Sequence, residues 1–321
     1  MLVRSALLIL FASAVPGAIS APVLREYVVT RPGNFPHDPA VGADGIVWYT
    51  DQSNSYIGRL DPATGIITDY PTPTPSSGPH GIVVAPDGGV WYTGQRTGII
   101  GRLDPATKSI REYPLPAETA NPHTPIWADG AIWYTDASNN RYGRLDPVTG
   151  DVRHFTCKTD NSVPYGIVLA PDGHIWIALL GTDKLARVDT ATGSMIEFQL
   201  PAGARPRRLA VGAGGTVWYT DYRRGFLGAL DPATSKVREW PAPFPGEGPY
   251  GIAIGPDGAI WYNHARGDAM TRFDPATEKS TLLQIPTKGA VVRHMVTDVP
   301  RKRIWLALSG TGRIGVIEFG S

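Results

Sequence analysis

The chain has 321 residues, of which 42% are hydrophobic and 18% are charged. This composition excludes a disordered polypeptide and allows one large domain or two of ordinary size. The 30 basic residues nearly balance 29 acidic ones, and no run of like charges occurs, so nothing predicts binding to nucleic acid or to a membrane surface.

The N-terminal segment, residues 1–20, contains Arg4, an apolar stretch over residues 6–15 and small residues at its end. This pattern predicts a cleavable signal peptide whose apolar part is too short to span a membrane. An uncleaved anchor is the alternative. We expect a single mature domain over residues 21–321, soluble, monomeric, periplasmic or secreted, with a small molecule as its partner. The lone Cys157 excludes an intramolecular disulfide and fits a small buried hydrophobe.

A sequence unit recurs seven times along the rest of the chain, with successive copies 42 to 44 residues apart. Each copy is centred on a tryptophan in a short apolar run: Trp48, Trp91, Trp133, Trp176, Trp218, Trp261 and Trp305. A fixed period of this length is typical of repeat architectures.

Each unit predicts four short strands, as residues 81–116 illustrate. The run GIVVA meets PDG, a hairpin turn, and GVWYT follows; IIGRLD, the turn PATKS and IREYPLP complete the unit. A single four-stranded sheet exposes two faces and is not stable alone. The sequence therefore predicts an all-β fold, a seven-bladed β-propeller of four-stranded antiparallel blades.

The two ends of the chain predict how the ring closes. Residues 25–27, REY, repeat residues 111–113, which belong to a fourth strand, whereas the last unit stops after its third strand. We expect the N-terminal strand to complete the last blade and so remove an open sheet edge.

The start of each innermost strand carries a polar or aromatic residue. These residues lie ten or eleven positions before each tryptophan: His37, His80, His123, Tyr165, Arg207, Tyr250 and His294. Because strand starts are equivalent in all blades, we expect these side chains to form a ring at one face. The imidazoles would lie on one side of it and the Arg/Tyr residues on the other, a suitable arrangement for binding a polar or anionic ligand and moving a proton.

A second ring is expected where the next strand returns to the same face, three residues after each tryptophan. Its members are Asp51, Gly94, Asp136, Leu179, Asp221, His264 and Leu308. The sequence predicts Asp51, Asp136 and Asp221 as substrate-binding residues together with the first ring. His264 and His294 are the predicted catalytic pair, because each departs from the pattern of the other repeats. The alternative for all of them is structural, since histidine and aspartate also cap backbone groups at turns.

The unit GPHGIVVAPDGGVWYT…GIIGRLDPAT…IREYPLP resembles the repeat of the virginiamycin B lyase (streptogramin lyase) family, over essentially the whole mature chain. The resemblance implies a seven-bladed propeller that opens a cyclic depsipeptide by β-elimination at its ester. It also implies functional histidine and glutamate side chains with a divalent metal, magnesium.

The chain departs from the family pattern at the functional positions. The family's last blade carries Glu-Pro-His; the resemblance aligns His294 with this histidine and Val292 with this glutamate. Tyr250 corresponds to a second functional histidine, and Leu308 and Ser309 to a further glutamate. The sequence therefore favours a lyase-like protein with a relocated site or a different ligand over a streptogramin lyase.

Three functions remain open. The first is a carbon–oxygen lyase, with His294 as base, His264 or a neighbouring histidine as acid, and Arg207 holding an anionic or carbonyl group. The second is a metal-dependent lactone hydrolase of the gluconolactonase type, and the third is a propeller that binds a ligand without catalysis.

Overall fold

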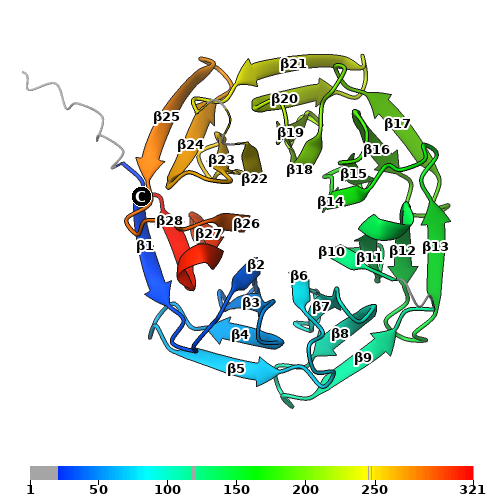
Figure 1. Cartoon of the computed structure of the whole chain (residues 1–321), viewed down its shortest axis with the longest axis vertical. Helices are drawn as coiled ribbons and strands as arrows, with labels where there is room; N and C mark the ends of the chain where they lie inside the picture. The colour runs from blue at the N-terminus through cyan, green and yellow to red at the C-terminus, as the bar shows by residue number, and fades with distance from the viewer. Residues whose placement is uncertain (1–20, 117–119, 245, 247, 321) are drawn as a thin grey trace, which may run out of the picture.

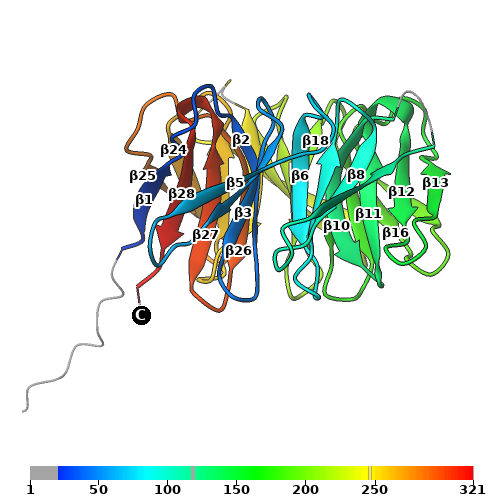
Figure 2. The ribbon, with the colours of Figure 1, turned by 90° about the horizontal axis from the view of Figure 1, so that it is seen from below.

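The computed structural model describes residues 21–116, 120–244, 246 and 248–320, so the predicted signal peptide lies outside it. Seven four-stranded antiparallel sheets stand around one axis, as predicted, and the innermost strand of each sheet lies nearest the centre (Figure 1). Seen from the side, the sheets form a disc with the strands running between its two faces (Figure 2). No helix in the described residues is long and apolar enough to cross a membrane.

The two inner positions of each blade carry the predicted site. The innermost strands, in blade order 1 to 7, are β2 (Pro36–Val41), β6 (Pro79–Val84), β10 (Pro122–Ala128), β14 (Pro164–Leu169), β18 (Pro206–Val211), β22 (Pro249–Ile254) and β26 (Val292–Asp298). The second strands are β3 (Val47–Asp51), β7 (Val90–Gly94), β11 (Ala131–Asp136), β15 (Ile175–Leu179), β19 (Val217–Asp221), β23 (Ile260–His264) and β27 (Arg303–Leu308).

The two outer positions complete each sheet. The third strands are β4 (Tyr56–Leu60), β8 (Ile99–Leu103), β12 (Arg141–Leu145), β16 (Lys184–Val188), β20 (Phe226–Asp231), β24 (Ala269–Asp274) and β28 (Arg313–Glu318). The fourth are β5 (Ile67–Pro71), β9 (Ile110–Pro114), β13 (Val152–Thr156), β17 (Met195–Gln199), β21 (Lys236–Pro241), β25 (Lys279–Gln284) and, in blade 7, β1 (Val23–Val28). Two short 3-10 helices, η1 (Ala137–Asn139) and η2 (Ser309–Thr311), follow β11 and β27.

The N-terminal strand closes the ring, as the repeat predicts. β1 pairs antiparallel with β28 over six residue pairs, from Val23 opposite Glu318 to Val28 opposite Arg313. In Figure 1 the blue and red ends of the chain lie side by side in one blade. In blade 7, β1 therefore covers the outer edge of β28, which would otherwise be an open sheet edge.

The core is divided among the seven interfaces between neighbouring blades. Each interface is a separate cluster; one of them packs Trp133 of blade 3 against Ile167 and Ile175 of blade 4. All seven repeat tryptophans are buried, with at most 8% of each exposed. The tryptophans thus hold the blades together by apolar burial, as expected for a radial stack.

A bulge at the start of the innermost strands places the ring residues. The pairing of β2 with β3 skips from Pro36 to Pro39, and the same irregularity occurs in the other six blades. A threonine of the second strand supports the bulge: the Thr50 hydroxyl accepts a bond from the Asp38 N–H and donates to the His80 carbonyl of the next blade at 2.7 Å. Because Thr93 and Thr135 bond the next ring residues similarly, neighbouring blades fix each other's ring positions.

Candidate functional site

Three imidazoles and a phenol ring form a row around the axis at one face, each tilted by 44–47° against the next. We call this the upper face; the innermost strands begin there. The ring centroids of His37 and His80 are 3.9 Å apart, those of His80 and His123 3.8 Å, and those of His123 and Tyr165 3.8 Å. The three histidines are 3–4% exposed. The predicted gathering of His37, His80 and His123 is therefore present, as a tightly packed row.

The opposite side of the ring is a hydrogen-bonded group of one arginine and two tyrosines. The Arg207 guanidinium donates to the Tyr165 hydroxyl at 2.9 Å and to the Tyr250 hydroxyl at 3.2 Å, and the two hydroxyls are 2.9 Å apart. The guanidinium also lies over both aromatic rings. We call Arg207, Tyr165 and Tyr250 the Arg–Tyr group; it offers a positive charge and phenol protons to an oxygen that gains negative charge.

The seventh ring position is Arg293, which corrects the expectation for His294. In blade 1 the partner of Trp48 is Ala40, eight positions earlier, whereas in blade 7 the partner of Trp305 is Val296, nine positions earlier. The one-residue difference makes Arg293 equivalent to His37 and His294 equivalent to Asp38. By this register the family's Glu-Pro-His position falls on residues 291–293, so its histidine position carries an arginine here.

His294 faces the axial cavity on the far side of the ring. This cavity has a volume of about 490 Å³; apolar side chains of the seven innermost strands make its wall, and Asp38, Thr124 and His294 lie at its inner end. The Nδ1 atom of His294 is buried and has no partner among the described residues. Burial, with the nearby charge of Arg208, lowers the pKa of His294 to about 3. The predicted base is thus neutral and lies outside the upper-face ring.

A buried arginine, which sequence reasoning missed, crosses the axis beneath the ring. Arg208 of β18 is 2% exposed, donates to the Thr124 hydroxyl of β10 at 2.9 Å and lies 3.5 Å from both carboxylate oxygens of Asp38 in β2. Its contacts join blades 5, 3 and 1. A signal was available, because two consecutive arginines stand in only one of the seven strand starts.

Hydrogen bonds to Nδ1 determine which ring nitrogen carries the proton in His37 and in His80. His37 Nδ1 lies 2.8 Å from the Asp38 carboxylate and His80 Nδ1 3.1 Å from the His123 carbonyl; since both partners only accept, both Nδ1 atoms are protonated. Their Nε2 atoms therefore carry lone pairs. The Thr124 hydroxyl accepts from Arg208 and lies 2.8 Å from His123 Nδ1, where it can donate or accept, so this contact is compatible with either tautomer of His123.

Burial and the charge of Arg208 keep the imidazoles of His37, His80 and His123 neutral. Desolvation lowers the pKa of His37, His80 and His123 well below 6.5, and the charge of Arg208 lowers it further in all three. Burial raises the pKa of Tyr165. It acts in the same direction on Tyr250, but the charges of Arg207 and Arg208 outweigh it and lower the pKa of Tyr250. The ring thus combines neutral imidazoles with an acidified phenol.

His264 is sealed behind the ring rather than exposed in it. It is 0% exposed, its Nε2 lies 2.7 Å from the Thr271 hydroxyl, and the Phe244 ring stands edge-on at 4.9 Å. Burial lowers its pKa to about 4. The side chain faces the inside of its blade, so its placement in a common mouth with His37 and His80 was wrong.

The predicted aspartates also lie beneath the loops of the upper face and not at the axis. Asp51, Asp136 and Asp221 are each 0% exposed. Each accepts a backbone N–H from the segment before the innermost strand, and each pairs with an arginine: Arg31, Arg141 or Arg224. In the structure these three residues hold the loops; their contact with a substrate stays a prediction.

One group of side chains has the spacing of a metal site. Nitrogen or oxygen atoms of His37, Asp38 and His80 all lie within 4.8 Å of one another. Magnesium prefers an octahedron of oxygen ligands, and this group offers one carboxylate, which already bonds His37 and faces the Arg208 guanidinium. The residues present therefore do not fit magnesium.

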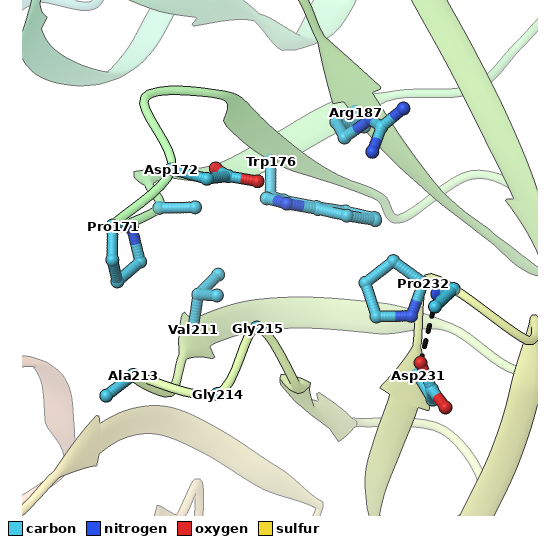
Figure 3. A pocket seen from close by; sticks show the side chains of 12 residues that line it. Pro171, Asp172, Trp176, Arg187, Val211, Ala213, Gly214, Gly215, Asp231 and Pro232 are labelled. Carbon is cyan, nitrogen blue, oxygen red and sulfur yellow. Dashed lines mark hydrogen bonds between the residues drawn. The ribbon is translucent and has the colours of Figure 1, made fainter.

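A cavity of about 270 Å³ near the hairpins of blades 4 and 5 carries no comparable chemistry. Its lining includes Trp176, Val211 and Pro232; of its acidic groups, Asp172 lies in a turn and Asp231 ends β20 (Figure 3). A similar cavity lies between blades 1 and 2, against Trp48. We attribute both to the geometry of the repeat.

Comparison with solved structures shows the same fold in several proteins. A streptogramin B lyase is 24% identical, with 93% of this chain and 98% of that chain covered at a TM-score of 0.86. Virginiamycin B lyase from Staphylococcus aureus is 25% identical, with 93% and 99% covered at 0.86. Hydrazine synthase from Kuenenia stuttgartiensis is 16% identical, with 90% and 97% covered at 0.77. Comparison with curated protein sequences gave no match.

A family model matches the chain over two overlapping ranges, residues 17–188 and 126–321, which together include every blade and the closing strand. The match agrees with the seven repeats and with the ring closure, and it extends far beyond half of the chain. The chain therefore belongs to the virginiamycin B lyase family.

Proposed function

We propose that this chain is an exported, periplasmic or secreted, monomeric carbon–oxygen lyase that acts on a small polar or cyclic ester at the upper face. The proposal rests on one observation: the Arg–Tyr group adjoins the row of His37, His80 and His123. In this row, His37 and His80 have lone pairs on Nε2. β-Elimination needs a base for the carbon-bound proton, an acid for the departing oxygen, and a group that stabilises the enolate oxygen. The ring offers all three.

His37 and His80 are the candidate bases. Their Nδ1 protons are donated to acceptors, so each Nε2 is free to take the proton from carbon. As that C–H bond breaks, a C=C bond forms and the C–O bond to the leaving group breaks. Tyr250, whose phenol pKa is lowered by the charges of Arg207 and Arg208, is the candidate acid that protonates the leaving oxygen. Arg207 holds the enolate oxygen.

This assignment replaces the pair named from sequence. His294 lies at the axial cavity and His264 is sealed against Phe244, so neither shares a surface with the Arg–Tyr group. The streptogramin lyase reaction is the natural first substrate test, because one solved relative is a catalytically inactive His-to-Ala variant of virginiamycin B lyase with quinupristin. The arginine at the family's histidine position favours a different ester for this chain.

The test is turnover of a panel of cyclic and β-acyloxy esters, with quinupristin included, by the mature chain. Elimination gives an unsaturated product that absorbs in the near ultraviolet and contains no oxygen from ¹⁸O-labelled water. His37→Asn and Arg207→Met should each lower kcat/KM by about 100-fold or more, as loss of a base or of an oxyanion partner does. Product that carries ¹⁸O would refute the lyase, and binding without turnover would make the chain a ligand-binding propeller.

A second candidate is metal-dependent hydrolysis of a lactone. The grouping of His37, Asp38 and His80 favours it, because two imidazole nitrogens and a carboxylate suit a zinc-type ion better than magnesium. The Arg208 guanidinium 3.5 Å from Asp38 opposes it, since it places a positive charge beside the cation. Metal analysis of the purified protein, with loss of activity on chelation, would decide for this candidate.

A further inference from the structure

The upper face has a second hollow, beside the axial ring, where loops of blades 4, 5 and 6 meet. Its volume is about 500 Å³, within the range of small-molecule sites. The residues that line it are Leu180, Arg205, Tyr222, Arg223, Gly246, Gly248 and Arg266. We call it the arginine pocket. Of the seven described residues that line it, three are arginines.

Buried hydrogen bonds hold one wall of the arginine pocket in place. Asp221, which is 0% exposed, accepts the backbone N–H groups of Arg205 at 3.1 Å and of Arg223 at 3.2 Å. The Arg205 guanidinium donates to the Gly181 carbonyl at 2.6 Å, and the Tyr222 N–H donates to the Arg205 carbonyl. The wall is thus fixed before any ligand arrives, which lowers the entropic cost of binding.

The opposite wall depends on a glycine. Gly248 has φ +62°, and a Cβ there would lie 2.9 Å from the Tyr222 carbonyl and 3.0 Å from its ring, so only glycine allows this approach. The Gly248 carbonyl accepts the Ala265 N–H at 2.9 Å and so ties down the loop that carries Arg266. Two separate loops therefore contribute arginines to one hollow.

The positive charge of the arginine pocket is not balanced within the described residues. Arg205, Arg223 and Arg266 form no ion pair there, whereas the neighbouring Arg224 pairs with Asp221 and Glu239. The whole chain has a net charge of only +1, so this is a local concentration of charge. Three guanidinium groups around one hollow repel one another unless an anion joins them, and guanidinium groups match the oxygens of carboxylate and phosphate.

We propose that the arginine pocket binds the carboxylate or phosphate group of a small-molecule ligand. Tyr222 connects it to the axial ring, because the Arg207 guanidinium lies 4.6 Å from the Tyr222 ring centre and the Tyr222 and Tyr250 rings meet edge-on. An anion held in the pocket thus places the rest of the molecule over the Arg–Tyr group. This second step rests on the proposed function and makes its substrate an anionic ester; the anion site itself does not.

The test is calorimetric titration of the full mature chain with inorganic phosphate and, separately, with succinate. Arg223→Gln and Arg266→Gln should each weaken binding by about tenfold or more, the usual loss for one charge-assisted hydrogen bond. Arg111→Gln is the matched control, because Arg111 is an exposed arginine of β9 outside the pocket, and it should bind as the parent does. The stronger of the two titrants identifies the oxyanion.

Equal affinity in the parent and both pocket variants would overturn the proposal. So would a fall of equal size in Arg111→Gln, because general attraction to a positive surface then explains the binding. Failure of catalysis is a separate outcome: His37→Asn, which removes the proposed base, should leave phosphate or succinate affinity unchanged. A chain that binds anions but turns over no ester would keep the anion site and refute the lyase.

Discussion

Arg208 adds to the effect of burial on the imidazoles from beneath the ring. Desolvation is the largest cause of the lowered pKa of His37, His80, His123 and His294, and the charge of Arg208 lowers the pKa of each further. It also orients the side chains that bond two of those imidazoles, Asp38 and Thr124. It is therefore a positioning residue rather than a catalytic one.

We expect Arg208→Met to raise the pKa of His37 and of His123, because a nearby positive charge is removed. The unpaired Asp38 should also destabilise the fold by roughly 3–5 kcal/mol, the usual cost of breaking a buried ion pair. Imidazole NMR titration and urea unfolding measure the two effects.

Arg207→Met is the control for the Arg208 experiment, since Arg207 ranks after Arg208 among the charges acting on both imidazoles. Adding Asp38→Asn to Arg208→Met should recover part of the lost stability. Unchanged imidazole titration in Arg208→Met would contradict the role given to this residue.

The ring could be predicted from sequence where the strand start keeps its proline. Six ring residues directly follow a proline and lie ten or eleven positions before their tryptophan, and this holds in blade 3 although its innermost hairpin is one residue shorter. The seventh was predicted wrongly, because the pairing of Trp305 is shifted by one residue and exchanges His294 for Arg293. A position at the end of a strand also does not tell which way its side chain turns, and for this reason Asp51 was assigned to the mouth.

In blades 1, 2, 3 and 5, a glycine of the third strand allows a tyrosine of the second strand to lie across it. A Cβ on Gly101 would meet the Tyr92 ring at 2.1–2.2 Å, and Gly58, Gly143 and Gly228 show the same crowding with their tyrosines. The Tyr92 hydroxyl reaches over the glycine to Glu112 of the outer strand at 2.8 Å. The repeat therefore uses one tyrosine to connect three strands.

Gly101→Ala should destabilise the protein by roughly 1–3 kcal/mol, the usual cost of overpacking, because the Tyr92 ring must move. Gly214→Ala is the matched control: a Cβ there meets no atom within 4 Å, and we expect no loss. Urea unfolding of the two variants measures the difference. Equal stability of both variants would show that the tyrosine moves without cost.

The strands, turns and ring closure were predictable because they depend on local patterns repeated seven times. Hairpin residues, the spacing of tryptophans and the match of residues 25–27 to a fourth strand determine the blade and its closure. The placement of Tyr165, Arg207 and Tyr250 on one side of the ring was predicted, but their mutual hydrogen bonds, the role of Arg208 and the arginine pocket were not, because those contacts join separate blades.

The whole molecule should lose stability between pH 6.5 and about 4. Five buried histidines have lowered pKa values: His37, His80, His123, His264 and His294. Below pH 6.5 the unfolded chain takes up protons that the folded chain excludes, so the free energy of unfolding falls as the pH falls. Each such group contributes up to roughly 1.4 kcal/mol per pH unit.

Urea midpoints measured at pH 7, 6, 5 and 4.5 test this dependence, in a range above the usual pKa of carboxylates. His264→Asn removes one of the five groups and should give a shallower slope, provided that the variant folds. A midpoint that stays constant down to pH 4.5 would mean that the imidazoles reach solvent and are not held neutral by the fold.

Buried side chains cross the axis of this propeller. Arg208 of blade 5 donates to Thr124 of blade 3 and faces Asp38 of blade 1, between the rings of the upper face and the cavity on the hairpin side. We therefore expect a molecule that binds at the Arg–Tyr group to leave through the upper face, so that a product that stays bound there prevents the next substrate from docking.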